Sequence, residues 1–237
     1  NDSLDYVEVD PFFRKGSHDK FTFSMCYAFS ENYILPISHD EVVHGKKSLL
    51  DKALVAYEDK FANFKAFLGY MFAHPGKKLT FMGVDIAQFI EWDEERQLDW
   101  FLLLYPKHSF SQRYVKELNK YYKSTPALWQ NDCDWNGFRW HVVDDNTNNV
   151  FAFSRIDNSG KEVLVVSNFS GQILKGYEIG VDTWGSYKTS LNSDAKKYDG
   201  TALQNRNLKT LNKKKNNFQY TLSINIPPYA TMYIEKK

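Results

Sequence analysis

The sequence predicts an α/β layer over residues 1–128, followed by an all-β, antiparallel sandwich domain over residues 129–237. Before Trp129, apolar residues recur at the three- and four-residue spacing of helices, between short apolar runs typical of strands. After Trp129, the sequence changes to short β-rich runs separated by turn clusters. The first pattern indicates parallel strands with helical crossovers, and the second indicates a β-sandwich.

The α/β layer is predicted to alternate helices with two strands. Residues 1–16 show no sustained period and are expected to form a loop with at most a short helix. Phe21, Met25, Ala28 and Phe29 have the spacing of an amphipathic helix, which leads into a strand at residues 33–37. That strand is almost wholly apolar, which is typical of a strand buried on both faces.

Two further helices are expected in this layer. The first carries a stripe of buried apolar residues and ends at Pro75-Gly76, and a strand follows at residues 78–82. Ser109 and Gln112 form a predicted capping box at the start of the second helix, which Pro126 stops. The aromatic residues assigned to the core on the first helix and its flank are Phe61, Phe64, Phe67 and Phe72.

Six strands are predicted in the sandwich, bounded by turn clusters such as Asp-Asn-Ser-Gly. A run of lysines and asparagines at residues 212–217 is expected to be a solvated hairpin tip. No flexible Gly/Ser linker separates the two parts, so the sandwich is expected to dock on the α/β layer. The predicted strands cover residues 138–143, 150–155, 163–168, 177–181, 218–226 and 231–234.

A dense cluster of ionisable side chains follows the strand at residues 33–37: His39, Asp40, Glu41 and His44. Loops at the carboxyl ends of parallel strands carry the chemistry of α/β barrels, so this placement suggests a functional site. On these letters alone, a structural alternative is favoured. Ser38-x-x-Glu41 fits a helix capping box, which needs no chemistry.

The longer segment, Leu35-Pro36-Ile37-Ser38-His39-Asp40-Glu41-Val42-Val43-His44-Gly45-Lys46-Lys47-Ser48, resembles the part of 1,4-alpha-glucan (glycogen) branching enzymes that carries the last His-Asp of the alpha-amylase superfamily. The resemblance covers essentially the whole chain. It continues through Phe61-Ala62-Asn63, Ala73-His74-Pro75-Gly76-Lys77-Lys78-Leu79, Phe81-Met82-Gly83, Glu91-Trp92, Leu98-Asp99-Trp100 and Pro227-Pro228-Tyr229-Ala230-Thr231.

This resemblance implies a fold and an activity. It implies that residues 1–128 are the C-terminal part of a TIM-type (β/α)8 barrel, the last two or so βα units, and that residues 129–237 are the C-terminal β-sandwich domain of amylase type. The implied enzyme is a glycosyltransferase of glycogen biosynthesis. It cleaves alpha-1,4-glucan (amylose, glycogen) and transfers the segment to a 6-hydroxyl, making alpha-1,6 branches by a retaining double displacement.

The same resemblance assigns roles to individual residues. Asp40 matches the third carboxylate of the family, which stabilises the transition state, and His39 matches its hydrogen-bonding neighbour. Glu41 and His44 belong to the longer signature that branching enzymes keep, so they are candidates for shaping the glucan groove. The nucleophile and the general acid of the family lie on earlier strands, so the 237-residue chain itself is predicted to be inactive.

Three further residues are candidate glucan contacts. Trp92 and Trp100 lie in a polar loop after a strand, where aromatic rings can stack on sugars. At Asp85 and Ile86 the family usually has Glu and Phe, and because Asp is one methylene shorter, a contact from Asp85 to substrate is in doubt. An alternative function is a non-catalytic glucan-binding or scaffolding module that lost catalysis.

Composition limits the classes of partner. The net charge of +1, from 30 basic and 29 acidic residues, gives no reason to expect nucleic acid or an anionic membrane. Cys26 and Cys133 fit neither metal-ligand spacing nor a disulfide framework, so both are expected to be buried thiols of a reducing compartment. A cytoplasmic monomer without metal or cofactor is expected. Because Asn1 is not an initiator methionine, we also expect the chain to be part of something longer.

Overall fold

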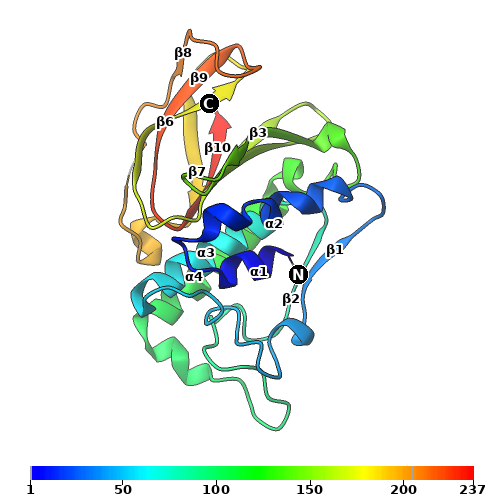
Figure 1. Ribbon diagram of the computed structural model, residues 1–237, viewed down its shortest axis with the longest axis vertical. Coiled ribbons are helices and arrows are strands. Elements are labelled where there is room, and N and C mark those ends of the chain that lie inside the picture. The colour runs from blue at the N-terminus through cyan, green and yellow to red at the C-terminus, as the bar shows by residue number, and fades with distance from the viewer. Residues whose placement is uncertain (1, 204) are drawn as a thin grey trace.

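Figure 1 shows the computed structural model, which describes residues 2–203 and 205–237: a layer of helices lies between a β-sandwich and a small two-stranded sheet. The α-helices are α1 (Asp2–Glu8), α2 (Asp19–Thr22), α3 (Tyr57–Ala73) and α4 (Pro106–Ser124). The strands are β1 (Ile34–Ile37), β2 (Lys77–Thr80), β3 (Phe138–Asp145), β4 (Val150–Ile156), β5 (Glu162–Asn168), β6 (Leu174–Val181), β7 (Tyr187–Asn192), β8 (Thr210–Leu211), β9 (Tyr220–Ile226) and β10 (Ala230–Lys236).

Strands β1 and β2 are parallel neighbours, as the crossover order predicts, with Ile34 opposite Lys77 and Ile37 opposite Thr80. The prediction that β1 is buried on both faces is wrong. Leu35 and Ile37 face α3, whereas Ile34, on the other face, is 56% exposed. This sheet has two strands in the described chain, and α3 covers one face of β1.

Helix α3 is buried almost all round, because it packs between the small sheet and the sandwich. The predicted core aromatics on this helix are confirmed as buried. The helix ends at Ala73 with His74 as its C-cap, and Gly76 follows with φ of 111°. Gly69 is where α3 approaches β10 most closely, since a Cβ there would lie 2.8 Å from the Cβ of Thr231.

Two helix predictions need correction. Ser109 does not cap α4, which begins three residues earlier with Pro106 in its first turn and Tyr105 at the N-cap. Proline suits this position because its missing N–H would have no partner there. The amphipathic segment over residues 21–29 is not one helix: it divides into α2 and the 3₁₀ helix η2 (Phe23–Cys26), and turns follow.

The antiparallel sandwich is confirmed. One sheet has the strand order β3-β4-β5-β10-β7 and the other β6-β9-β8, with antiparallel pairing throughout. Strands β7 and β8 were not predicted from the sequence. Residues 212–217 lie in the connection between β8 and β9 and are almost all exposed, as expected of a solvated hairpin tip.

The junction, meaning the contact of α3 with β5 and β10, belongs to one continuous apolar core that includes residues of both the helical layer and the sandwich. Two hydrogen bonds cross it directly: Thr231 Oγ1 donates to the Ala66 carbonyl at 2.8 Å, and the Tyr233 hydroxyl donates to the Gly69 carbonyl at 2.5 Å. Shared apolar burial and these bonds hold the sandwich against the helices.

Two fully buried arginines tie the same layers together at either end. Arg14 donates to the carbonyls of Val7 and Phe169, at 2.9 and 2.8 Å. Arg155 donates to the Ala73 carbonyl at 2.8 Å and forms an ion pair with the buried Asp132 at 2.7 Å. Each guanidinium therefore links backbone or side-chain groups that are far apart in the sequence.

The prediction of buried thiols is wrong. Cys26 and Cys133 are both exposed. Cys26 ends the short helix η2 at the surface, and Cys133 stands between the buried, ion-paired Asp132 and Asp134, which caps the helix η6 (Trp135–Gly137). Both thiols line a shallow hollow between the helical layer and the start of the sandwich.

Candidate functional site

The candidate site is built on the loop that follows β1, which we call the Asp40 loop (residues 38–48). Since β1 and β2 are parallel and Ile37 lies opposite Thr80, the Asp40 loop and the segment starting at Phe81 leave the sheet at the same edge. This is the edge at which α/β proteins place their ligands. The fold thus brings together two segments about forty residues apart, as the register of the strands requires.

The first turn of the loop is the 3₁₀ helix η3 (His39–Glu41), and it contains the capping box that the sequence suggested. Ser38 Oγ accepts from the Asp40 backbone N–H at 3.2 Å, and a Glu41 carboxylate oxygen accepts from the Ser38 N–H at 2.6 Å. Burial raises the pKa of Glu41, but the hydrogen bonds from the Ser38 hydroxyl and backbone outweigh it, so the net pKa is lowered. Glu41 is held as an anion.

Asp40 contributes its backbone N–H to this cap, which leaves its carboxylate outside the capping box. The carboxylate lies 3.4 Å from His39 Nε2, and the two side chains are 71% and 55% exposed. The Lys46 ammonium donates to the Asp40 carbonyl at 2.7 Å. The backbone around Asp40 is therefore fixed, while its carboxylate and the imidazole beside it face solvent together.

Aromatic rings stand beside His39. Its ring centroid lies 6.1 Å from that of Phe81 and 6.2 Å from that of Trp92, and these two rings pack edge-to-face at 5.1 Å. Trp92 is half-buried, and its backbone N–H donates to the Val42 carbonyl at 3.0 Å. Trp92 thus supports the Asp40 loop and presents part of its ring beside His39.

Glu91 is a functional candidate that sequence reasoning missed. Its carboxylate accepts from the backbone N–H groups of Gly45 at 2.9 Å and Lys47 at 2.6 Å. These hydrogen bonds lower the pKa of Glu91. His44, Gly45 and Lys47 all have positive φ, so their backbone forms a concave nest around the anion. Glu91 therefore sets the shape of the far half of the Asp40 loop.

The structure does not bring all the predicted residues together. His44 is exposed in the same loop, with φ of 53°. Trp100 is 52% exposed and begins the helix η4 (Trp100–Leu104). Asp85 lies against α4, in a polar depression with Gln112 and Arg113. Within residues 2–203 and 205–237, neither Asp85 nor Trp100 has a hydrogen bond, ion pair or ring contact with the Asp40 loop.

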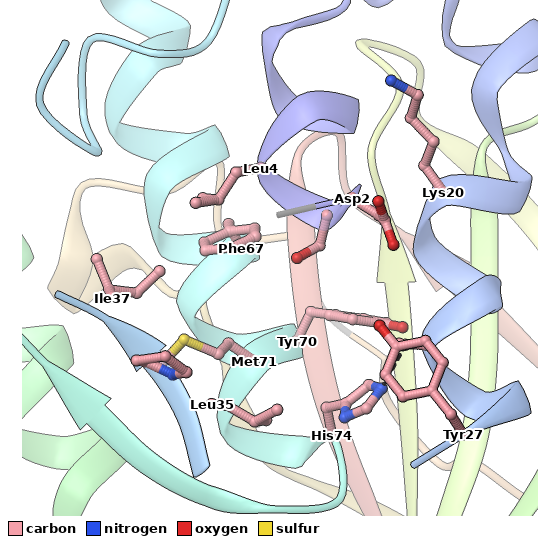
Figure 2. Close-up of a pocket in the computed structure, with 13 residues that line it drawn as sticks. Asp2, Leu4, Lys20, Tyr27, Leu35, Ile37, Phe67, Tyr70, Met71 and His74 are labelled. Carbon is pink, nitrogen blue, oxygen red and sulfur yellow. Dashed lines mark hydrogen bonds between the residues drawn. The ribbon is translucent and has the colours of Figure 1, made fainter. Parts of the chain in front are cut away.

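A hollow of about 140 Å³ lies on the face of β1 that is turned toward α3, between α1, α3 and the segment of α2 and η2 (Figure 2). Its polar groups are largely occupied. His74 Nε2 pairs with Ser24 Oγ at 2.8 Å, and the Tyr70 hydroxyl donates to the Phe21 carbonyl at 2.9 Å. Because the exposed carboxylate and imidazole are at the Asp40 loop, we place the candidate site there.

The chain is similar to several known proteins. The alpha amylase C-terminal all-beta domain matches residues 140–237. The 1,4-alpha-glucan branching enzyme GlgB of Halothermothrix orenii is 44% identical over 99% of this chain and 38% of its own length. That of Aquifex aeolicus is 46% identical over 99% and 38%, and that of Photobacterium profundum 44% over 100% and 33%.

The resemblance to 1,4-alpha-glucan branching enzymes is confirmed. These three relatives cover the whole chain, whereas the chain spans only 33% to 38% of their lengths. Among solved structures, the alpha-amylase from H. orenii matches 99% of this chain and 47% of its own, with a TM-score of 0.51 and 14% sequence identity. That likeness concerns the fold alone.

No helix of the described residues is long and apolar enough to cross a membrane.

Proposed function

We propose that this chain is part of a 1,4-alpha-glucan branching enzyme, to which it contributes Asp40 as the carboxylate that stabilises the transition state. Residues 1–128 would then be the last two or so βα units of a (β/α)8 barrel, and residues 129–237 its C-terminal β domain. The parallel pairing of β1 with β2 across α3, and the fold likeness to an alpha-amylase, support this assignment.

The observation that carries the proposal is the geometry of Asp40. Its carboxylate is exposed at the carboxyl edge of a parallel sheet, 3.4 Å from the His39 imidazole, while the backbone below it is capped. In retaining glycosyl transfer, positive charge develops on the sugar ring as the glycosidic bond breaks. A fixed carboxylate that binds ring hydroxyls and faces that charge lowers the barrier, and His39 orients the same hydroxyls.

We propose binding roles for the surrounding residues. The half-buried ring of Trp92 beside His39 offers an apolar face to a glucose unit. Glu91 and Glu41 shape the loop, and His44 is exposed within it. Trp100 and Asp85 lie further from the Asp40 loop, so their contacts with glucan would be at more distant sugar units.

We also propose that these 237 residues alone make no branches. A retaining mechanism needs a nucleophile and a general acid about 5 Å apart, and the acid must carry a proton near neutral pH. Glu41 and Glu91 are the carboxyl groups bound within the candidate site, and hydrogen bonds lower the pKa of both. Neither is suited to donate a proton, which supports a general acid supplied by another part of the enzyme.

The test compares Asp40→Asn with Glu94→Gln in the full-length enzyme. Glu94 is an exposed carboxylate in a turn between β2 and η4, so its variant removes the same charge. Asp40→Asn should lower kcat by roughly 10²-fold or more at unchanged melting temperature, because it removes charge stabilisation of the transition state. Glu94→Gln should keep normal turnover.

Turnover is measured on amylose, through the iodine colour and the alpha-1,6 linkages formed. Near-normal branching by Asp40→Asn would reject the catalytic role. Branch formation by the 237-residue chain, in proportion to protein concentration, would reject the proposal that the acid and nucleophile lie elsewhere. Glucan binding without any effect of Asp40→Asn in the full-length protein would favour the alternative of a binding module.

A further inference from the structure

A second hollow, remote from the Asp40 loop, lies in the sandwich between β7 and the chain that follows it, residues 195–203 and 205–207. Its volume is about 430 Å³, within the range that binds small molecules. Five of its 15 lining residues are cationic and none is acidic. The cations are Lys188, Lys196, Lys197, Arg206 and Lys237.

The ratio of basic to acidic residues around this hollow differs from that of the chain as a whole. With 30 basic and 29 acidic residues in 237, about two of each would be expected among 15 lining residues. Two carboxylates approach the hollow from behind: Glu117 pairs with Lys197, and Glu235 accepts from Ser190 and pairs with Lys161. Lys188 lies opposite Glu235 across β7 and β10, and no ion pair engages Lys196 or Lys237 within the described residues. The hollow therefore has excess positive charge.

The wall of the hollow also carries uncommitted hydrogen-bonding groups. Strand β7 is the outer strand of its sheet, so alternate backbone N–H groups point away from β10, and one of these, the Tyr187 N–H, already donates to the Leu208 carbonyl at 2.8 Å. The strand carries a bulge at Ser190, between the pairs of Thr189 and Leu191 with β10, and bulges accumulate beside binding sites. The Thr189 hydroxyl oxygen is buried without a hydrogen-bond partner, which is costly unless a ligand supplies one.

We propose that this hollow binds a small molecule that bears a phosphate group. Lysine ammonium groups and backbone N–H groups are the donors that proteins use for phosphate, and a compact dianion best matches several cations around one cavity. The volume exceeds that of inorganic phosphate, so a phosphorylated sugar also fits by size. The shared chemistry is the phosphate, whether free or esterified.

The experiment measures binding by calorimetry on the folded chain, with glucose 6-phosphate, inorganic pyrophosphate and glucose as separate ligands. Saturable binding of one phosphate ligand per chain, with none for glucose, is expected. Tighter binding of glucose 6-phosphate identifies a phosphate ester as the ligand, and tighter binding of pyrophosphate identifies a free phosphate. Absence of saturable binding by both phosphate compounds overturns the proposal.

Variants locate the binding site. Lys188→Gln/Lys196→Gln should weaken binding about tenfold, since each cation near a surface contributes a few-fold. The matched control, Lys175→Gln/Lys214→Gln, removes the same charge from exposed, unpaired lysines elsewhere on the sandwich and should change affinity less than about twofold. Equal losses in both variants would show diffuse attraction and would overturn the proposal. Thr189→Val should weaken binding a few-fold while both phosphate ligands still saturate.

Discussion

The Asp40 loop and the junction between α3 and the sandwich hold their polar side chains in opposite ways. Beside the junction, Arg155 and Asp132 are buried and form an ion pair with each other. At the Asp40 loop, the carboxylates of Glu41 and Glu91 bind backbone N–H groups, while the carboxylate of Asp40 and the ring of His39 face solvent. Substitutions at the junction should therefore cost stability, and substitutions at Asp40 should cost activity.

The largest stability effect is expected from Arg155→Met. The change removes five hydrogen bonds, to carbonyls of residues 73, 128, 131 and 137 and to Asp132, and leaves Asp132 with its ion pair to the exposed Lys77. Breaking a buried ion pair in this way costs about 3–5 kcal/mol. Urea denaturation measures the loss.

Asp132→Asn in the Arg155→Met background removes the stranded charge and should restore part of that stability. A loss below about 1 kcal/mol in the single variant, as at ordinary surface positions, would mean that this pair does not hold the junction.

The next effect is a pH dependence of stability that comes from His74. A carbonyl can only accept, so Nδ1–H donates to the Pro75 carbonyl and Nε2 accepts from the Ser24 hydroxyl, which requires the neutral ring. Burial lowers the pKa of His74 to about 4. Because the unfolded chain binds this proton near pH 6.5, stability is complete above about pH 6.5 and falls by about 3 kcal/mol on the way to pH 4.

Denaturation across this pH window tests the prediction. His74→Gln should flatten the dependence, leaving the smaller contribution of His18, whose pKa is also lowered by burial. His44→Asn alters an exposed histidine of the Asp40 loop, at a positive φ that Asn accepts, and should leave the slope as it was. Equal slopes in His74→Gln and the unmodified chain would contradict the assignment.

A smaller effect on stability distinguishes Ser38 from Asp40 within the Asp40 loop. Ser38→Ala should cost about 1 kcal/mol, the usual loss for an N-cap, because the Asp40 N–H loses its acceptor. Asp40→Asn should change stability by less than about 0.5 kcal/mol, since its side chain is exposed. Melting curves of the two variants give the comparison, and the reverse order would mean that Asp40, rather than the cap, holds the loop.

The smallest effect concerns the thiols. Since Cys26 and Cys133 are exposed, both should react with a thiol reagent in the folded chain about as fully as after denaturation. Cys26→Ser and Cys133→Ser should each remove one reactive equivalent, with stability changes within about 0.5 kcal/mol. A thiol that reacts only in denaturant would restore the prediction of burial.

What the sequence predicted, and what it did not, follows from the range of the interactions involved. Strands β4, β5 and β10 are continuous apolar runs and were found, whereas β7, with Lys188, Thr189 and Ser190 at its centre, lacks that pattern. The start of α4 was missed because Ser109 looked like a cap, although Pro106 is the better signal for a first turn.

At the candidate site, the resemblance gave His39 and Asp40, and the capping box could be read from Ser38 and Glu41. Glu91 could not be found in this way. It binds backbone N–H groups 44 and 46 residues away, and backbone donors leave no trace in the residue types of the loop. Its place beside Trp92 in the matching segment was the only available sign.

The position of β10 has a consequence for the order in which the chain becomes stable during synthesis. This strand, residues 230–236, lies inside the five-stranded sheet and meets α3 through a contact between Thr231 and Ala66, 165 residues apart. On a ribosome, α3 emerges many seconds before its partner, at roughly 5–20 residues per second. Until then the apolar flank of α3 that packs on β10 stays uncovered, which exposes the nascent chain to aggregation.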